Sequence, residues 1–176
     1  IVDNGNETID MLYSCLPGEL PVPEMAVNLN SVIHDILLLS SQKILGADVS
    51  VSWEPAKRLP SIIGNDVRLR FMVKQLIDNA VEAMNVSTIR SRTLRVRTLS
   101  EGDAIHLYVE DSGPGIPAEQ RMKVFQPFVS TKGSLGQQAG MGLVLVHEVV
   151  RQHCGMVEID PDYIDGCCFH LRFPTS

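Results

Sequence analysis

Apolar residues return every three or four positions in three long segments of this chain of 176 residues. Residues 28–46 carry such a stripe and end in a glycine, which predicts a single helix. Residues 59–85 read as a loop followed by a long helix, because the apolar positions from Leu69 onward keep the 3.6-residue period. Residues 141–155 repeat the pattern and also end in a glycine, which predicts a third, buried helix.

Other segments alternate between apolar and polar residues, the period of a strand with one buried face. Residues 48–54 predict one strand, and residues 93–100 and 103–111 lie close enough to pair as a hairpin. Residues 156–174 predict a final pair of strands, and residues 117–125 predict a short helix with a proline near its start. This order favours an α+β fold, a two-layer sandwich in which one mixed, mostly antiparallel sheet is covered by helices on a single face.

Two segments lack a pattern that would place them in this core. Residues 1–16 read as a short, weakly amphipathic helix, and three prolines follow within the next seven residues. We therefore expect residues 1–26 to be an N-terminal helix and linker, the remnant of a preceding helical segment, and residues 27–176 to be the compact domain. Residues 126–140 are rich in glycine and glutamine without a period, which predicts a mobile loop.

Charge and cysteine content narrow the class of protein. The formal net charge of −6 argues against a nucleic-acid-binding platform. No apolar run approaches the roughly 20 residues of a membrane span, so no membrane contact is expected. The four cysteines, Cys15, Cys154, Cys167 and Cys168, have neither zinc-site spacing nor the pattern of a disulfide framework, which favours reduced thiols in a cytoplasmic protein.

The stretch "YVEDSGPGIP", residues 108–117, places an acid and two glycines directly after an apolar strand. One interpretation is a tight turn, since glycine adopts backbone angles that other residues avoid. The other is a binding pocket, in which the Asp111 carboxylate accepts a hydrogen bond from an exocyclic amine such as that of adenine. Gly113 and Gly115 would then let a flat ring approach the backbone.

Further polar positions fit the second interpretation. Asn79 lies beside the apolar stripe of the long helix, where its amide can satisfy a core contact or hold a metal ion and phosphate oxygens. Lys132 lies in the loop and can reach a phosphate. Gly140 and Gly142 open the third helix, and free N–H groups at such a helix start form an anion cradle.

Together these segments resemble the GHKL superfamily of ATP-binding domains, which joins histidine kinases, Hsp90, DNA gyrase B and MutL. "LIDNAVEAM" is similar to the family's asparagine box, "EDSGPGI" to the first glycine box, "FQPF" to the F box and "GMGL" to the second glycine box. The end of the chain, "HCGMVEID" and "DGCCFHLRFP", resembles the close of histidine kinases. The resemblance covers about residues 27–174 and implies the Bergerat fold, with ATP or ADP and Mg²⁺ as ligands.

The resemblance also implies a role for each matching residue. Asn79 would coordinate the Mg²⁺ ion that bridges the phosphates, and Asp111 would bind the adenine amine. Lys132 would contact a phosphate under a lid formed by residues 129–139, and the helix start at Gly142 would hold the phosphates. The nucleotide-binding residues expected in this way are Asn79, Ala83, Asp111, Gly113, Gly115, Ile116, Phe128, Thr131, Lys132, Gly140, Met141, Gly142 and Leu143.

Two departures from the family bear on activity. Gln75 stands where gyrase, Hsp90 and MutL carry a glutamate that activates water, and where typical histidine kinases have asparagine. An amide cannot act as a general base, so we do not expect ATP hydrolysis of that kind, and we assign no catalytic residue. A kinase also needs an acceptor histidine on a separate helical hairpin. His34 and His147 are each followed by an acid, but both align with helices inside the ATP-binding domain.

The stretches "QLIDNAVEAMN" and "STKG" are similar to the nitrogen-regulation branch of the kinases, and Gln75 extends the similarity to the C-terminal domain of the nitrogen-fixation regulator NifL. Members of that family bind a transcriptional activator in a nucleotide-dependent way, without phosphotransfer. This implies a nucleotide-responsive module of a signalling protein that binds a protein partner. The alternative is the catalytic domain of an active sensor histidine kinase that phosphorylates a histidine outside this chain.

Three kinds of protein partner fit these alternatives: a transcriptional activator, a response regulator, or the protein's own dimerisation domain, with a dimer expected only in the full-length protein. One cluster of charge could serve such a partner. Arg90, Arg92, Arg95 and Arg97 fall within eight residues, and Arg95 and Arg97 share one face of a strand. Either they line a solvated sheet edge, or they form a docking patch for an acidic partner.

Overall fold

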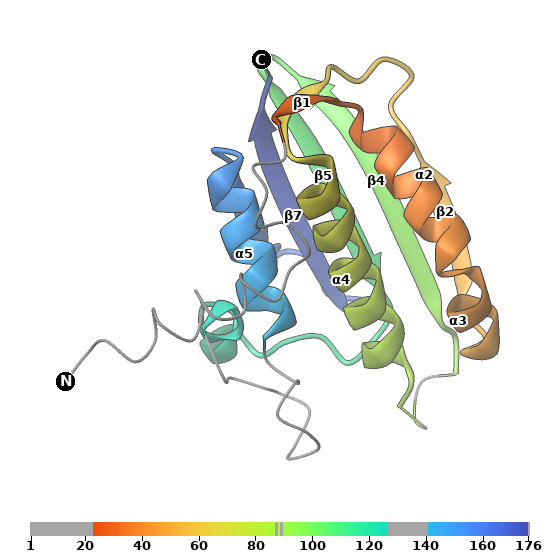
Figure 1. Ribbon diagram of the computed structural model, residues 1–176. Helices are drawn as coiled ribbons and strands as arrows, with labels where there is room; N and C mark the ends of the chain where they lie inside the picture. The colour runs from red at the N-terminus through yellow and green to blue at the C-terminus, as the bar shows by residue number, and fades with distance from the viewer. Residues whose placement is uncertain (1–22, 87, 89, 127–140, 176) are drawn as a thin grey trace.

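A five-stranded sheet with helices on one face forms the body of the structure, a computed structural model that describes residues 23–86, 88, 90–126 and 141–175 (Figure 1). β2 runs parallel to β4, and every other neighbouring pair in this sheet is antiparallel. The prediction of an α+β sandwich with a mixed, mostly antiparallel sheet is therefore confirmed. In spatial order the strands are β2 (Ser50–Glu54), β4 (Thr93–Glu101), β5 (Ala104–Asp111), β7 (Cys167–Pro174) and β6 (Met156–Ile159).

Three helices cover one face of the sheet, and α4 lies between the other two (Figure 1). They are α2 (Leu29–Leu39), α4 (Asp66–Met84) and α5 (Gly142–Gln152). Alternate residues of the strands point toward these helices and are buried, as the period of two predicted. The core between the two layers is formed chiefly by Leu69, Met72, Leu76, Ile77, Leu94, Ile105, Leu107, Val146, Val149, Leu171 and Phe173.

Two very short strands form a second, separate ladder that the sequence pattern did not reveal. β1 (Met25–Val27) pairs antiparallel with β3 (Ile62–Gly64), in segments that we expected to be linker and loop. Three residues are too few to display a period of two, so pattern analysis cannot detect them. Residues 1–22, for which a helix and linker were predicted, lie outside the described residues.

The helix predicted over residues 28–46 is divided in two, which corrects that expectation. α2 ends at Leu39, Ser40 adopts φ −90° and ψ 0°, and α3 (Ser41–Gly46) follows. Serine side chains compete for backbone hydrogen bonds, which weakens a helix at this pair. The short helix predicted over residues 117–125 is likewise replaced by two 3-10 turns, η1 (Ala118–Gln120) and η2 (Lys123–Phe125). A helix of so few residues gains too few hydrogen bonds to offset its nucleation cost.

His153 ties the end of α5 to the beginning of α4. Its Nε2 accepts a hydrogen bond of 3.0 Å from the backbone N–H of Asn65, the N-cap of α4, and its Nδ1 lies 2.7 Å from the carbonyl oxygen of Val149. The imidazole ring is buried and lies directly against Gly64, where a β carbon would collide with ring atoms. The glycine is therefore needed to seat the ring.

Within the residues that the structure describes, no helix combines the length and the apolar character needed to cross a membrane.

Gly64→Ala is expected to destabilise the domain, because the new methyl group must displace the His153 ring. Overpacking of this kind costs about 1–3 kcal/mol in the free energy of unfolding, measurable by urea denaturation. Gly46→Ala is the matched control, because a β carbon there meets no atom within 4 Å and alanine favours the helix. Equal stability of the two variants would contradict the proposed seating of His153.

Candidate functional site

Gln75, Asn79 and Ala83 form a row along α4, because residues four apart lie one above another on a helix. The apolar residues of α4 are buried in the core, so the rotation of the helix about its axis is fixed. With a rise of about 1.5 Å per residue, the row is about 12 Å long. A glycine-containing segment meets this row at each end.

The loop after β5 meets the row at Ala83. Asp111, the last residue of β5, is only 2% exposed, and its Oδ1 accepts a hydrogen bond of 2.8 Å from the backbone N–H of Gly113. A β carbon on Gly113 would lie 3.3 Å from two atoms of Ala83, the carbonyl carbon and the β carbon. The structure thus brings together Asp111, Gly113 and Ala83, three of the residues that the sequence predicted for one site.

Gly166 belongs to this end of the site, although the sequence analysis gave it no role. It precedes β7 at φ 158°, and a β carbon there would collide with the carbonyl oxygen of Asp111 and lie 3.0 Å from the nitrogen of Gly113. Gly115, at φ 75°, approaches the carbonyl of Gly166 in the same way. The available signals were the aspartate–glycine pair before the last strand, which also occurs in ordinary turns, and the resemblance of "DGCCFHLRFP" to the close of histidine kinases.

The start of α5 meets the other end of the row. A β carbon on Gly142 would lie 2.5 Å from Oε1 of Gln75 and 4.0 Å from Nδ2 of Asn79. Met141 is the N-cap and makes no side-chain hydrogen bond to the first turn. The first N–H groups of a helix have no partners within the helix, and they carry the positive end of its dipole. Asn79 therefore lies beside an electropositive helix start.

The Asn79 amide carries a buried polar atom that the surrounding protein does not satisfy. Among the described residues its Nδ2 has no hydrogen-bond partner. Rotating the amide by 180° exchanges its nitrogen and oxygen, so the side chain can offer either a donor or an oxygen ligand at this point. A buried amide without a partner is costly, which favours a site completed by a bound group over the core contact considered above.

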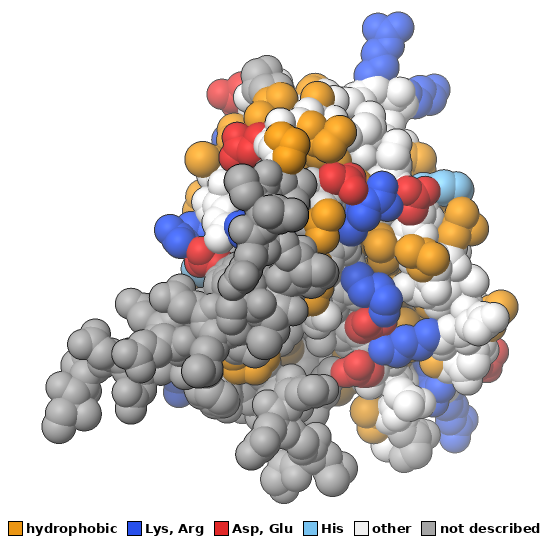
Figure 2. Space-filling model, viewed as in Figure 1, with side chains coloured by type: hydrophobic (Ala, Val, Ile, Leu, Met, Phe, Trp, Pro, Cys, Tyr) orange, Lys and Arg blue, Asp and Glu red, His pale blue; other side chains and the backbone are white. Residues whose placement is uncertain are grey.

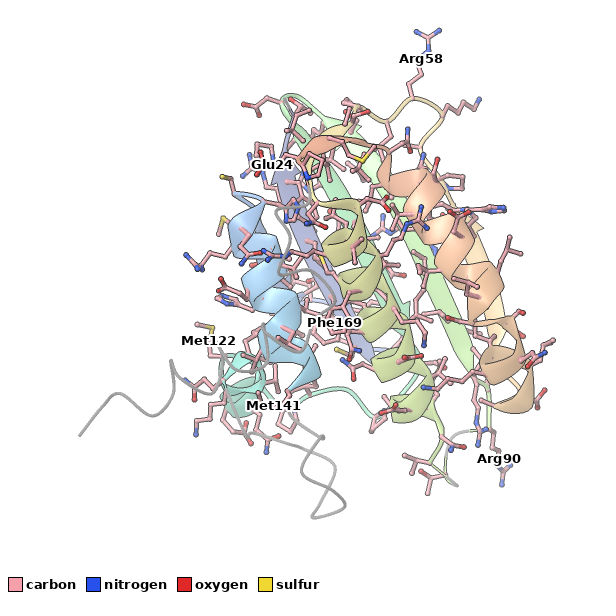
Figure 3. The ribbon with its side chains drawn as sticks, in the orientation of Figure 1. Glu24, Arg58, Arg90, Met122, Met141 and Phe169 are labelled. Carbon is pink, nitrogen blue, oxygen red and sulfur yellow. The ribbon has the colours of Figure 1, made fainter. Side chains whose placement is uncertain are left out.

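Aromatic contacts hold the segment after the first glycine pair against α5. The ring of Phe125 in η2 lies 5.9 Å from the ring of His147 and 6.2 Å edge-on from that of Phe169, as centroid distances. Ile116 packs against the core, and its carbonyl oxygen accepts a hydrogen bond of 3.2 Å from Nε of Arg121. Figure 3 shows Phe169 beneath the α4–α5 pair and Met141 at the start of α5.

The remaining predicted residues divide into two groups. Met141 is buried and Leu143 packs against the core, both beside Gly142. Four others belong to the segment 127–140, so their positions lie outside the described residues: Phe128, Thr131, Lys132 and Gly140.

Ionisable groups around the site do not form a metal centre by themselves. The described residues contain no group of three or more His, Cys, Asp or Glu side chains arranged to hold a metal ion. Cys167 pairs in register with Asp111, and burial followed by the nearby carboxylate raises the pKa of its thiol far above the ordinary value. A metal bound here would need most of its ligands from a bound molecule.

The arginine cluster of β4 is engaged within the chain. Arg95 makes two hydrogen bonds to Glu54, of 2.8 and 3.0 Å, and Nε of Arg97 donates one of 3.0 Å to Glu110. β4 lies between β2 and β5, so the interpretation as a sheet edge is wrong. Docking of an acidic partner at these arginines stays a prediction.

Charged side chains of both signs lie close together over α2 and α4, on the helix side of the molecule. In Figure 2 acidic and basic side chains alternate over α2 and α4. Lys43 and Lys74 both contact Asp78, and Arg70 contacts both Asp35 and Asp66. These ion pairs are partly exposed, so each contributes little to stability. They place opposite charges next to one another on α2, α3 and α4.

Comparison with known proteins places the chain in a family. Residues 64–176 match the family described as histidine kinase-, DNA gyrase B- and HSP90-like ATPases. Because this match covers more than half of the chain, the chain belongs to that family. The sequence is also 29% identical, over 99% of its length, to the sensor histidine kinase TmoS of Ectopseudomonas mendocina, but it spans only 18% of that protein.

Solved structures agree on the fold. The nucleotide-free catalytic domain of histidine kinase ThkA superposes with a TM-score of 0.75 at 22% identity, covering 88% of this chain and 97% of that one. Full-length ShkA in complex with AMPPNP gives a TM-score of 0.74 at 22% identity, covering 89% of this chain and 32% of that one. The chain therefore has the fold of the ATP-binding domains of histidine kinases.

Contact between Gly142 and Gln75 predicts a non-additive pair of substitutions. Gly142→Ala should destabilise the domain because the methyl group meets the Gln75 amide, and Gln75→Ala should relieve that clash. The double variant is then more stable than the sum of the single effects predicts, by on the order of 1 kcal/mol. Urea denaturation of the four proteins measures this coupling, and simple additivity would show that the two side chains do not meet.

Proposed function

We propose that this chain binds an adenine nucleotide along the row on α4, with the base at Asp111 and the phosphates at the start of α5. The observation that carries the proposal is the arrangement of the row itself. Ala83 lies against the Asp111–Gly113 turn at one end, and Gln75 and Asn79 lie against Gly142 at the other. An acceptor for an amine and a helix start for phosphates thus meet opposite ends of a row about 12 Å long, a length suited to a nucleotide.

Asp111 would orient the base. The bond from Gly113 fixes the orientation of the Asp111 carboxylate, whose oxygens can accept about four hydrogen bonds in all. The absence of side chains at Gly113 and Gly115 would allow a planar ring to lie against the backbone. Specificity for adenine would then come from the match between the exocyclic amine and the buried acid.

Mg²⁺ fits the other end of the row. The amide of Asn79, whose Nδ2 has no partner among the described residues, can supply one oxygen ligand, and Mg²⁺ in such sites takes its other ligands from phosphates and water. When bound, the ion would neutralise phosphate charge. The N–H groups at Gly142 and Leu143 would orient the phosphates, and the neutral Gln75 amide would lie beside them without acting as a base.

We further propose that the nucleotide state of this domain is read by a protein partner, as in the NifL-like reading of the sequence. Gln75 supports this function, because its amide lies beside the start of α5 and cannot act as a general base. The partner would be a transcriptional activator, a response regulator or a dimerisation domain of the same protein. The second candidate is the catalytic domain of an active sensor kinase, which the relatedness to TmoS favours.

Incubating the full-length protein with ATP labelled at the γ-phosphate distinguishes the two candidates. Label that becomes attached to a histidine of the protein supports the kinase. Nucleotide binding without any transfer of label supports the regulatory module.

Asp111→Asn should weaken ADP binding, because an amide in the same place can present a donor toward the adenine amine. Loss of a charge-assisted hydrogen bond costs about 1.5–3 kcal/mol, or roughly a 10- to 150-fold rise in Kd. Calorimetry measures the change, and Asp103→Asn, at the exposed residue just before β5, is the matched control. Unchanged affinity in a folded Asp111→Asn variant would refute the placement of the base.

Asn79→Ala should weaken binding of Mg²⁺–ATP more than binding of ATP in the presence of a chelator. The reason is that the amide oxygen is assigned to the metal, whereas the base and the helix start remain intact. Calorimetric titrations with and without Mg²⁺ give the ratio of the variant Kd to the wild-type Kd in each condition. Equal losses in both conditions would instead identify Asn79 as a structural amide.

A further inference from the structure

The face of the sheet turned away from the helices carries a row of stacked planar side chains. The guanidinium of Arg97 lies 4.1 Å from the ring centroid of Tyr108, and that ring stacks on His170 with centroids 4.3 Å apart and planes 5° apart. His106 continues the row, with its centroid 5.2 Å from that of His170. These residues come from β4, β5 and β7, and none of them takes part in the proposed nucleotide site on the other side of the sheet.

Two histidine nitrogens face each other within this row. Nδ1 of His106 lies 2.8 Å from Nε2 of His170, and Nδ1 of His170 lies 3.2 Å from a carboxylate oxygen of Glu158 on β6. A carboxylate accepts, so Nδ1 of His170 carries a proton and its Nε2 presents a lone pair. A single proton, donated by Nδ1 of His106, then occupies the space between the two rings.

Both rings are accessible to a metal ion. The two histidines are partly exposed, with 20% of the His170 side chain open to solvent, so an ion can reach them. Imidazole nitrogens are common ligands of transition metals.

We propose that His106 and His170 form a site for a divalent transition-metal ion on the helix-free face of the sheet, with Glu158 as the outer carboxylate that orients His170. The separation of 2.8 Å between the two nitrogens is close to the distance of about 2.9 Å between adjacent ligands of a square or octahedral ion. Each ring must turn until its lone pair converges on the ion. His106 moves its proton from Nδ1 to Nε2, so that Nδ1 presents a lone pair to the ion.

The chemistry of the pair selects the class of ion. Imidazole nitrogens suit copper, nickel and zinc and disfavour Mg²⁺ and Ca²⁺, which prefer oxygen. Since no third His, Cys, Asp or Glu among the described residues completes the group, water would fill the remaining positions. A carboxylate bonded to the outer nitrogen of a metal-bound histidine raises the basicity of that ligand, and Glu158 is placed to do so.

Nickel titration of the nucleotide-free protein, in excess Mg²⁺, tests the site. The ring-proton NMR signals of His106 and His170 should broaden at lower Ni²⁺ concentrations than those of His34, His147 and His153. His106→Gln and His170→Gln each leave only one of the two imidazole ligands, so each variant should bind Ni²⁺ at least tenfold more weakly. Each should also lose the Ni²⁺-dependent rise in Tm. Glu158→Gln should weaken it by a smaller factor.

His34→Gln is the matched control, since His34 is exposed on α2 and lies on the other layer. It should leave Ni²⁺ affinity unchanged. Simultaneous broadening of all five histidines, or wild-type affinity in a folded His170→Gln variant, would overturn the proposal. Because no nucleotide is present, the outcome is independent of whether the nucleotide site has been assigned correctly.

Discussion

Burial of one face of α4 is the constraint on which the candidate site depends. Leu69, Met72, Leu76 and Ile77 are fully enclosed between the sheet and the flanking helices. Protein interiors are close-packed, so the helix cannot rotate about its axis without opening cavities. This fixes the direction of the row formed by Gln75, Asn79 and Ala83, which meets the loop after β5 at one end and the start of α5 at the other. The same apolar residues that stabilise the fold therefore set the direction in which Asn79 points.

Much of this arrangement could be predicted from the sequence because it rests on long, regular patterns. Several residues together predict each of three features: the apolar stripe on α4, the hairpin of β4 and β5, and the start of α5 at Gly142. The motifs then assigned Asp111, Asn79 and Gly142 to one site, and the structure brings them to opposite ends of one row.

The parts that sequence analysis missed depend on contacts between distant segments. Gly166 must be a glycine because the end of β5 at Asp111 passes close to it, and the residues around Gly166 do not by themselves predict that contact. The pairing of β1 with β3 and the contact of His153 with Gly64 were missed for the same reason, because each joins segments that lie far apart in the sequence. The division between α2 and α3 has a local cause instead. The apolar period continues through the division, but the hydrogen-bonding preference of the serines at Ser40 and Ser41 outweighs it.

The attachment of His153 to Asn65 also governs how α5 can move. It anchors the C-terminal end of α5 to the beginning of α4, whereas the opposite end of α5 meets Gln75 of α4 at Gly142, where glycine offers a minimal surface. A helix held at one end behaves as a lever. Over about 16 Å of helix, each degree of tilt about His153 shifts the Gly142 end by about 0.3 Å. A tilt of three or four degrees at the anchored end thus moves the Gly142 end by about 1 Å, which is enough to make or break a hydrogen bond.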